Sequence, residues 1–411
     1  MSTVATRRFG AASLRTLVHG LASALDREWV SSPAGRYPVV SGELWSARQR
    51  RGHSLHEVSY RACFKAELPR YFITRLSSPG EIVLDPFAGR GTTVLEANLL
   101  GRAGIANDVN PLAQRLLAPR TRPPTLEEVR DRLRRNPLDA NRKRTADPRL
   151  RPFYHRDTLH EMLNLRDYLA EHRDPIDAFI EVTAVTRLWG HSAGFFSVYS
   201  LPPNQAPSAA AQRRINARLG QRPGYRAIAP RILAKARTLL RDVTPAQRDR
   251  LGMASARNRY TCDDSRALHA LGDASVDLVI TSPPFLDQAD YLADNWLKMW
   301  FLGIDDGDLA GRLVRTPDLA AWEDFMHATL RELHRVLKPG RACVVEVGEV
   351  ARRGVRIDLD RRIAERAAQA GFEVVGVLIN AQRCTKTAHI FRVTNNERGT
   401  NTNRMVVLRK P

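Results

Sequence analysis

A short apolar run that passes through a glycine turn into a helical pattern constrains the fold of this chain most. It occupies residues 83–97 and reads Val-Leu-Asp-Pro-Phe-Ala-Gly-Arg-Gly-Thr-Thr-Val-Leu-Glu-Ala. Gly89 and Gly91 permit positive φ angles and let a ligand approach the backbone closely. Thr92 or Thr93 can cap the helix that follows. Because a helix N-terminus behind a glycine turn favours a nucleotide-like or carboxylate-bearing ligand, the stretch predicts a ligand-binding strand–turn–helix unit.

Two common nucleotide-binding fingerprints do not fit this turn. The nicotinamide fingerprint needs a glycine or alanine three residues after Gly91, where Val94 stands. A phosphate-binding P-loop needs a Gly-Lys-Ser/Thr sequence, which does not follow. The next predicted strand, residues 102–107, ends at Asp108. In doubly wound folds an acidic residue at this place holds the ribose hydroxyls of a nucleotide, so the pattern favours a nucleoside-containing ligand.

A second stretch, residues 277–285, is predicted to be a buried strand that runs into a stiff Ser-Pro-Pro turn. Each proline fixes its own φ angle and restricts the residue before it. The Ser282 hydroxyl and the carbonyls of Ser282 and Pro283 would form a rim of hydrogen-bond acceptors beside the ring of Phe285. A planar ring that bears an amino group would suit this rim. The alternative is a plain Pro-Pro turn with a core phenylalanine, because proline-rich turns are common.

Taken together, the Asp-Pro-Phe-Ala-Gly-Arg-Gly-Thr-Thr and Thr-Ser-Pro-Pro-Phe motifs resemble those of the S-adenosylmethionine-dependent methyltransferases that modify exocyclic amines of DNA bases. The resemblance covers the two motifs and the spacing of the strands around them. In this family Ser-Pro-Pro-Phe/Tyr is more typical of cytosine-N4 enzymes, and Asp- or Asn-Pro-Pro-Tyr of adenine-N6 enzymes. Many cytosine-N4 members place the Ser-Pro-Pro motif first, whereas here the glycine motif comes first. The adenine alternative therefore stays open.

The resemblance implies methyl transfer from S-adenosyl-L-methionine to a DNA base, most typically at N4 of cytosine, with the base flipped out of the duplex. The residues that it places around the target base are Ser282, Pro283, Pro284 and Phe285. The residues that it places around the cofactor are Phe64, Asp85, Phe87, Gly89, Gly91, Thr92, Asp108 and Asp264. Asp264 is preferred to its neighbour Asp263 as the partner of the cofactor's adenine amino group.

The same resemblance implies a Rossmann-like, doubly wound, mostly parallel α/β sheet, the class I methyltransferase fold. Helical spacing of apolar residues and an excess of basic residues predict a large, mainly helical basic insert in it. We assign residues 1–50 to an N-terminal helical extension and residues 51–110 to the first part of the methyltransferase domain. Residues 111–258 are assigned to the insert, and residues 259–411 to the second part of the domain. The extension is expected to be a helix, Ala11 to Asp26, followed by a polar linker.

The insert is predicted to start with a proline- and arginine-rich linker, residues 111–124, and to continue with helices. The expected helices are Leu126 to Arg135, Asp157 to Glu171, Pro175 to Trp189, Ala209 to Leu219 and Ile228 to Val243. No further sheet strand is expected until about residue 259. At the end of the chain, residues 405–408 should form the last strand, in an antiparallel hairpin at the sheet edge.

Charge is concentrated in the insert. The whole chain of 411 residues carries a formal net charge of +20, and the insert holds 28 Lys and Arg against 14 Asp and Glu, which is 28 − 14 = +14. Asn204 and Gln205 lie in a Gly-, Pro- and amide-rich break and could read a base edge, while Arg213 and Arg214 on the next helix could contact phosphates. The insert is therefore the candidate target-recognition region. The alternatives are a loop that only closes the active site and a solvated basic surface.

The rest of the sequence gives expectations about metal sites, the cellular compartment and the partners of the protein. Cys63, Cys262, Cys343 and Cys384 show no Cys-x-x-Cys spacing, so no metal site is predicted, and free thiols fit a reducing cytoplasm. The basic start of the chain would also fit a targeting segment. No apolar run approaches the ~20 residues of a membrane span, so no membrane partner is expected. DNA is the expected partner, and a partner restriction nuclease fits the resemblance. Two competing hypotheses are an RNA base methyltransferase and a non-enzymatic nucleic-acid binder.

Overall fold

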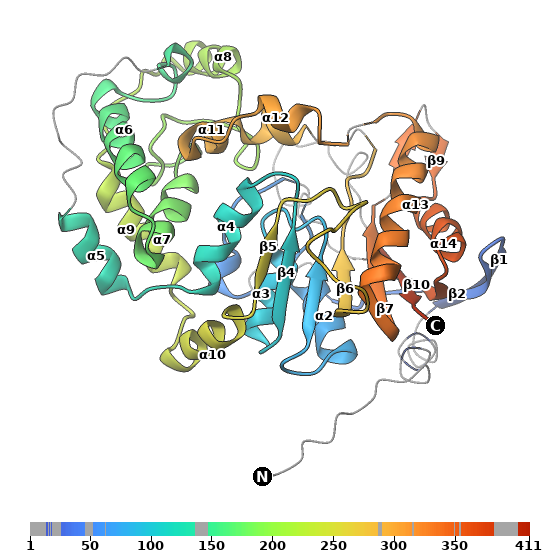
Figure 1. The fold of residues 1–411 in the computed structure, drawn as a ribbon. Coiled ribbons are helices and arrows are strands. Elements are labelled where there is room, and N and C mark those ends of the chain that lie inside the picture. The colour runs from blue at the N-terminus through green and yellow to red at the C-terminus, as the bar shows by residue number, and fades with distance from the viewer. Residues whose placement is uncertain are drawn as a thin grey trace, which may run out of the picture.

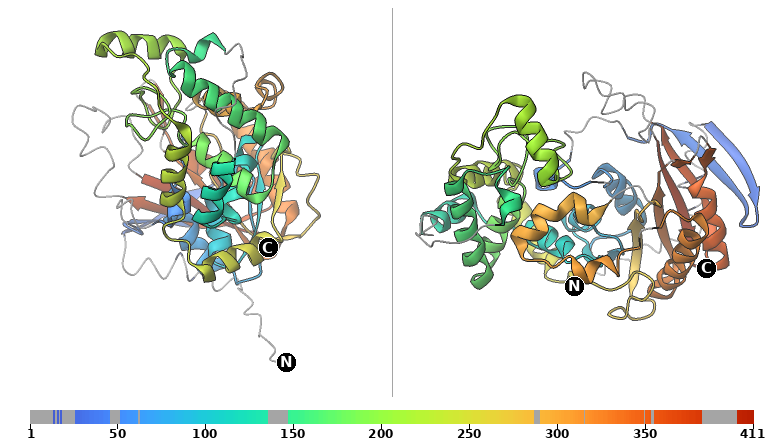
Figure 2. Two further views of the ribbon diagram at one scale, coloured as in Figure 1. Left: turned by 90° about the vertical axis from the view of Figure 1, so that its left-hand side faces the viewer. Right: turned by 90° about the horizontal axis from the view of Figure 1, so that it is seen from above.

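The computed structural model shows an α/β domain beside a helical lobe (Figure 1). The residues that it describes are 14, 16, 18, 26–45, 52–61, 63–135, 147–286, 290–314, 316–348, 350–352, 355–381 and 402–411. The domain is built on a nine-stranded sheet, and the lobe lies beyond one edge of that sheet (Figure 2). Among the described residues, no helix is both long and apolar enough to cross a membrane.

Five parallel strands form one half of the sheet. In spatial order they are β5 (Arg259–Thr261), β4 (Ala103–Asn107), β3 (Ile82–Asp85), β6 (Val276–Thr281) and β7 (Leu337–Val347). Beyond β7 comes β11 (Thr402–Arg409), which is antiparallel to both β7 and the next strand, β10 (Glu373–Ala381). The strand order reverses between β3 and β6, and a ligand crevice forms at such a switch point in open α/β sheets. The predicted doubly wound, mostly parallel sheet is confirmed.

Neighbouring residues of the central strands point to opposite faces of the sheet, as the pleat requires. Leu84 and Val279 face the layer formed by α13 (Leu319–Val336) and α14 (Leu359–Gln369). Val83 and Leu278 face α2 (Glu67–Leu76) on the other side. These strands are apolar on both faces because helices cover both, which is why they read as continuous hydrophobic runs.

A hairpin at the far edge corrects the prediction for the N-terminal extension. It consists of β1 (Asp26–Ser32) and β2 (Gly35–Gly42), and β2 pairs in parallel with β10. The linker predicted after the first helix is therefore partly sheet. Tyr37 and Val40 are buried by this pairing, which depends on a strand more than 300 residues away and leaves little local signal. Of the predicted helix Ala11 to Asp26, Leu14 and Val18 are helical, and most of the rest lies outside the described residues.

The lobe contains the expected helices with small shifts at their ends. They are α5 (Leu126–Arg135), α6 (Arg156–Glu171), α7 (Pro175–Val185), α8 (Ala209–Leu219) and α9 (Ile228–Leu239). Two helices were not predicted, α4 (Leu112–Thr121) and α10 (Pro245–Ser255). The linker expected at residues 111–124 is mostly α4. Pro111 stands at the N-cap, where a missing N–H is tolerated, whereas Pro119 lies inside the helix and leaves one intrahelical hydrogen bond unmade.

The remaining elements connect these layers. The helices are α3 (Thr92–Leu99), α11 (Tyr291–Leu302) and α12 (Gly307–Ala310), and the single 3-10 turns are η1 (Ser54–His56) and η2 (Pro148–Leu150). A small separate hairpin is formed by β8 (Val350–Arg352) and β9 (Val355–Ile357). As expected, within the described chain the insert adds no strand to the sheet before β5.

A pair of glycine substitutions tests the packing of β4 on α3. A Cβ at Gly104 would lie 2.3 Å from Val94 Cγ1, so Gly104→Ala should lower the free energy of unfolding by about 1–3 kcal/mol. Gly252 lies in α10 with no atom within 4 Å of such a Cβ, so Gly252→Ala should raise it by up to about 1 kcal/mol. Urea unfolding measures both. Equal effects of the same sign would contradict this packing.

Candidate active site

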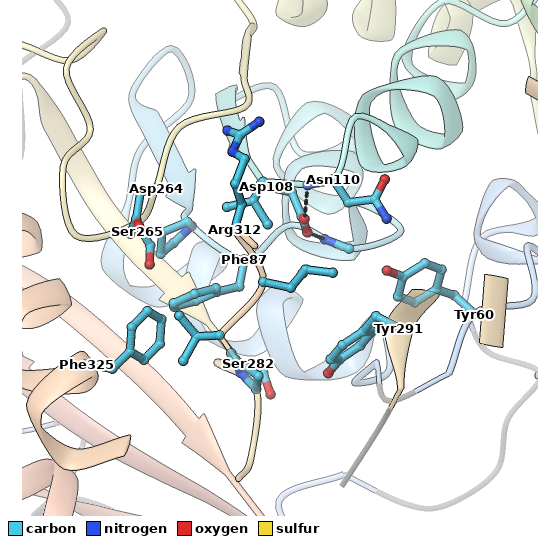
Figure 3. A pocket seen from close by; sticks show the side chains of 16 residues that line it. Tyr60, Phe87, Asp108, Asn110, Asp264, Ser265, Ser282, Tyr291, Arg312 and Phe325 are labelled. Carbon is cyan, nitrogen blue, oxygen red and sulfur yellow. Dashed lines mark hydrogen bonds between the residues drawn. The ribbon is translucent and has the colours of Figure 1, made fainter. Parts of the chain in front are cut away.

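The carboxyl ends of β3, β4 and β6 meet at one edge of the sheet, and a cavity opens there (Figure 3). Its walls come from the glycine turn, the loops after β4, β5 and β6, the start of α11 and the loop before α13. The residues that line it are Tyr60, Pro86, Phe87, Gly89, Asp108, Val109, Asn110, Asp264, Ser265, Ser282, Pro284, Tyr291, Arg312, Leu313, Val314 and Phe325. The two sequence motifs thus share one cavity, although nearly 200 residues separate them.

The glycine turn has two positive φ angles, +51° at Gly89 and +78° at Gly91. The two glycines serve different purposes. Gly89 borders the cavity, while a Cβ at Gly91 would lie 2.5 Å from Leu117 of α4, so Gly91 is required for packing as well as for the turn. The predicted threonine cap is wrong, because Gly91 itself is the N-cap and no side chain caps α3. Thr92 is buried and accepts a hydrogen bond from Arg90 instead.

Asp85 lies beneath the cavity at the end of β3. Its Oδ1 accepts hydrogen bonds from Thr281 Oγ1 at 2.7 Å and from the Phe87 N–H at 3.1 Å. The carboxyl group therefore joins the ends of β3 and β6 and holds the start of the glycine turn. Burial raises the pKa of Asp85 to about 6, although the hydrogen bonds from Thr281, Thr93 and Phe87 favour the charged form.

Asp108 lies at the end of β4, where the sequence placed it, and it borders the cavity. Its carboxylate accepts hydrogen bonds from the N–H groups of Gly89 and Asn110, each at 2.9 Å. Burial raises the pKa of Asp108, and the two N–H donors oppose this. A carboxylate has about four acceptor positions, so Asp108 keeps acceptor capacity toward the cavity.

Asp264 borders the opposite end of the cavity from Tyr60 and Tyr291 (Figure 3). It forms an ion pair with Arg266, whose Nη2 lies 2.6 Å from Asp264 Oδ2, and the hydrogen bonds from Arg266 lower the pKa of Asp264. Asp263 does not border the cavity, and its N–H donates to Asn107 Oδ1. Asp264 is thus the one of the two that borders the cavity, and its contact with a cofactor stays a prediction.

The two predicted phenylalanines near the cofactor motif are placed differently. Phe87 borders the cavity and its ring centroid lies 5.9 Å from that of Phe325. Phe64 packs instead against the core under α2, and its carbonyl accepts a hydrogen bond from Arg90. A direct contact of Phe64 with a ligand in this cavity therefore stays a prediction.

The Ser-Pro-Pro turn follows β6 and presents Ser282 to the cavity. Ser282 Oγ donates a hydrogen bond to Glu346 Oε2 at 2.6 Å, and the Pro284 carbonyl accepts one from Trp322 Nε1 at 2.8 Å. Among the described residues, none donates a hydrogen bond to the carbonyls of Ser282 or Pro283. Pro283 is buried and does not itself border the cavity, so the rim of acceptors stays a prediction. Phe285 packs against the core cluster that contains Trp322 and is not part of the cavity wall.

Glu346 is a functional candidate that the sequence reasoning missed. It lies near the end of β7, is buried, and also accepts a hydrogen bond from Asn403 Nδ2 at 2.9 Å. Burial raises the pKa of Glu346, and the bonds from Ser282 and Asn403 oppose this. One signal was available, because Glu346 is a carboxylate within the otherwise apolar predicted strand 342–347, and buried carboxylates need partners.

The predicted recognition residues lie on the lobe, outside the cavity. Asn204, Arg213 and Arg214 are exposed, and the two arginines lie on α8. Gln205 is half-buried and borders a second groove together with Arg149 and residues of α11. Arg213 and Arg214 are therefore accessible to a polyanion.

Residues 26–118 match a protein-family model described as DNA methylase. The chain is 25% identical over 287 residues to the type II methyltransferase M.BsoBI of Geobacillus stearothermophilus, which covers 64% of this chain and 56% of the relative. It is 34% identical over 89 residues to the type II methyltransferase M1.MboII of Moraxella bovis, 20% of this chain and 33% of the relative. The resemblance to the amino-methylating DNA methyltransferase family is confirmed.

Solved structures in this comparison include the putative DNA modification methylase TTHA0409 of Thermus thermophilus in complex with S-adenosyl-L-methionine. It is 26% identical to this chain with a TM-score of 0.23, and the match covers 36% of this chain and 53% of that one. The chain also spans only 56% of the length of M.BsoBI. The similarity to this methyltransferase family is therefore concentrated in part of each protein.

The buried carboxyl group of Asp85 should make the stability of the fold depend on pH. Its folded-state pKa of about 6 lies above the ordinary value of 3.8, so the stability it contributes is present below about pH 4 and is lost as the pH rises through 6. Asp85→Asn should therefore stabilise the fold at pH 8, by on the order of 2–3 kcal/mol, and much less at pH 4.5. Thermal unfolding at both pH values measures this difference. A gain that is the same at both would contradict it.

Proposed function

We propose that this protein is a DNA methyltransferase that transfers a methyl group from S-adenosyl-L-methionine to an exocyclic base amine, N4 of cytosine. The observation that carries the proposal is the shared cavity, in which Ser282 faces the glycine turn and Asp108. Ser282 is already oriented by Glu346. The DNA methylase match of residues 26–118 supports the same function.

The chemistry of the cavity fits the proposed cofactor. Two carboxylates border the cavity, Asp108 and Asp264, which can accept hydrogen bonds from ribose hydroxyls and from an adenine amino group. The lining also includes apolar groups, Val314 and the ring of Phe325, that would be available to an adenine ring. Gly89 would lie close to the methionine part. Asp85 and Gly91 would not contact the cofactor themselves and would instead hold the glycine turn in place.

S-adenosyl-L-methionine supplies an electrophilic methyl carbon on a sulfonium when it is bound. The attacking base amine is conjugated with its ring and is a poor nucleophile. The Ser282 hydroxyl and the Pro283 carbonyl would accept hydrogen bonds from its two N–H groups and direct the nitrogen lone pair at the methyl carbon. Because Ser282 donates its own hydrogen to Glu346, its oxygen lone pairs are left for the amine.

Proton removal completes the reaction. As the new N–C bond forms, the amine nitrogen becomes positively charged and must lose one proton. The Ser282 hydroxyl can pass its own hydrogen to Glu346 while it takes the proton of the amine. The buried position of Glu346 raises its pKa and so makes its carboxylate a better proton acceptor. No cysteine nucleophile is needed, since the nitrogen itself attacks.

The partner of this chemistry would be double-stranded DNA. A base inside a duplex cannot reach the cavity and would have to be flipped out. Arg213 and Arg214 would contact phosphates, and Asn204 and Gln205 would contact the DNA near the target. The division of the chain into two methyltransferase segments around a recognition insert belongs to the same proposal. A partner nuclease stays a prediction.

Product analysis tests the proposed reaction. The purified protein is incubated with S-adenosyl-L-methionine and whole-genome-amplified DNA, or with unmodified RNA, and the nucleosides are identified by mass spectrometry. We expect N4-methylcytosine in DNA and at least about a 100-fold lower rate for Ser282→Ala, since one preorganised hydrogen-bonding group contributes about that much. Formation of N6-methyladenine would contradict cytosine as the target base. A methylated product found only in RNA would contradict DNA as the substrate. The absence of cofactor binding by calorimetry would overturn the enzyme function.

The pH dependence of the rate tests the role of Glu346. Only its carboxylate form can accept the proton, so the rate should fall as the pH drops through the raised pKa of Glu346, which lies above the ordinary value of 4.5. In Glu346→Gln the rate should be lower at every pH and this acidic limb should vanish. The pH profile of kcat for both proteins is the measurement. If kcat of Glu346→Gln falls at low pH as it does in the wild type, the titrating group is not Glu346.

Salt dependence tests the recognition surface. If Arg213 and Arg214 each neutralise one phosphate, Arg213→Ala and Arg214→Ala should each reduce the slope of log Kd against log salt by about 0.9. Arg250→Ala is the matched control, because Arg250 is also an exposed helical arginine but lies on α10, away from α8 (Figure 1). Equal slopes in all three variants and the wild type would place the DNA elsewhere.

A further inference from the structure

Tyr291 is the first residue of α11 and borders the cavity on the side of the Ser-Pro-Pro turn (Figure 3). Its ring stacks on that of Tyr60, with centroids 6.5 Å apart and an interplanar angle of 26°. The start of α11 is capped by Asp290, whose Oδ1 accepts a hydrogen bond from the Ala293 N–H at 3.0 Å. The position of Tyr291 is therefore set by a helix start and by a neighbouring ring.

Tyr60 is held in turn by the glycine turn and by α11. A Cβ at Gly89 would lie 3.4 Å from the Tyr60 ring, so the ring rests against the turn. Lys298 of α11 is buried, with Nζ 5.2 Å from the Tyr60 ring centroid, and it donates to the Ser59 carbonyl at 2.7 Å and to Asn295 Oδ1 at 2.9 Å. Tyr60 thus occupies the side toward the glycine turn, while Tyr291 occupies the side toward Ser282.

The other aromatic rings near the turn are engaged elsewhere. Phe285 packs into the core cluster, Trp296 donates to the Pro207 carbonyl at 3.0 Å, and the Arg166 guanidinium lies 5.4 Å from the Trp300 ring centroid. None of the three borders the cavity. Phe87 and Phe325 do border it, but at the end that holds Asp264. Among the described aromatic residues, Tyr291 is the one that faces the space beside Ser282 without resting on the glycine turn.

We propose that Tyr291 supplies a stacking face for the target base while Ser282 and Pro283 hold its amine. This inference rests on the proposed function and adds a substrate-contacting residue that neither sequence motif contains. A tyrosine ring is rigid and every base has an aromatic face, so the contact gives affinity without strong dependence on base identity. Burial raises the pKa of Tyr291 to about 12, so the phenol stays neutral and adds no charge beside the reacting amine.

Two substitutions of Tyr291 distinguish the contribution of its ring from that of its hydroxyl group. Tyr291→Phe keeps the stacking face, and Tyr291→Ala removes it. We measure the Kd for S-adenosyl-L-methionine by calorimetry, together with kcat and the KM for whole-genome-amplified DNA. In Tyr291→Ala we expect kcat/KM for DNA to fall by roughly 5- to 150-fold, the range for loss of one base–aromatic stack. The Kd for the cofactor should stay within about twofold, and Tyr291→Phe should remain close to the wild type in all three values.

Two results would overturn the inference. One is an equal loss of cofactor affinity in Tyr291→Ala, which would assign Tyr291 to the cofactor site. The other is an unchanged kcat/KM for DNA. Tyr291→Trp provides a second test should Tyr291→Ala fail to fold, because a tryptophan ring keeps a stacking face and should keep DNA methylation. A wild-type protein that binds cofactor but methylates no DNA would overturn the proposed function and this inference together, whereas methylation that is indifferent to Tyr291 would overturn the inference alone.

Discussion

The arrangement of the site depends on one buried carboxyl group at the switch point of the sheet. Asp85 ends β3, accepts a hydrogen bond from Thr281 at the end of β6, and accepts another from the backbone of the glycine turn. Ligand crevices in open α/β sheets form where adjacent strands send their connections in opposite directions. Here Asp85 directly precedes the cavity-lining Pro86, and its burial makes its charge unfavourable. The buried carboxyl group thus lowers the stability of the fold, while its hydrogen bonds fix the distance between the two motifs.

The hydrogen bonds within the site leave some acceptor groups available to a ligand. Asp108 uses its carboxylate to hold the glycine turn and keeps further acceptor positions toward the cavity. Ser282 gives its only hydrogen to Glu346 and so presents an acceptor. Glu346 lies on β7, the neighbour of β6 in the sheet. The order of the strands therefore decides which acidic residue reaches the serine.

The parts of this molecule that local rules control can be predicted from the sequence. The runs that became β3, β4 and β6 were recognised because they are short, apolar and followed by turn residues. The prediction of a threonine cap for α3 failed, because Gly91 already ends the turn in a left-handed conformation and packs against Leu117. Proline content predicts a linker at residues 111–124, but Pro111 stands only at the N-cap of α4, and Leu112, Leu116 and Leu117 pack the helix into the core. The β1–β2 hairpin was missed because its partner strand is distant in the chain.

The sequence by itself determined that the chain contains a strand–glycine turn–helix unit, a stiff Ser-Pro-Pro turn and an acidic residue after the second strand. These depend on φ preferences and hydrophobic periodicity, which act within a few residues. Only the tertiary structure decided that Glu346 meets Ser282, that Tyr291 and Tyr60 flank the cavity, and that Phe285 turns into the core. Those contacts join residues from different elements, some of them far apart in the chain, and no local preference specifies them. They follow from the order of the strands and from the packing of α11 across their ends.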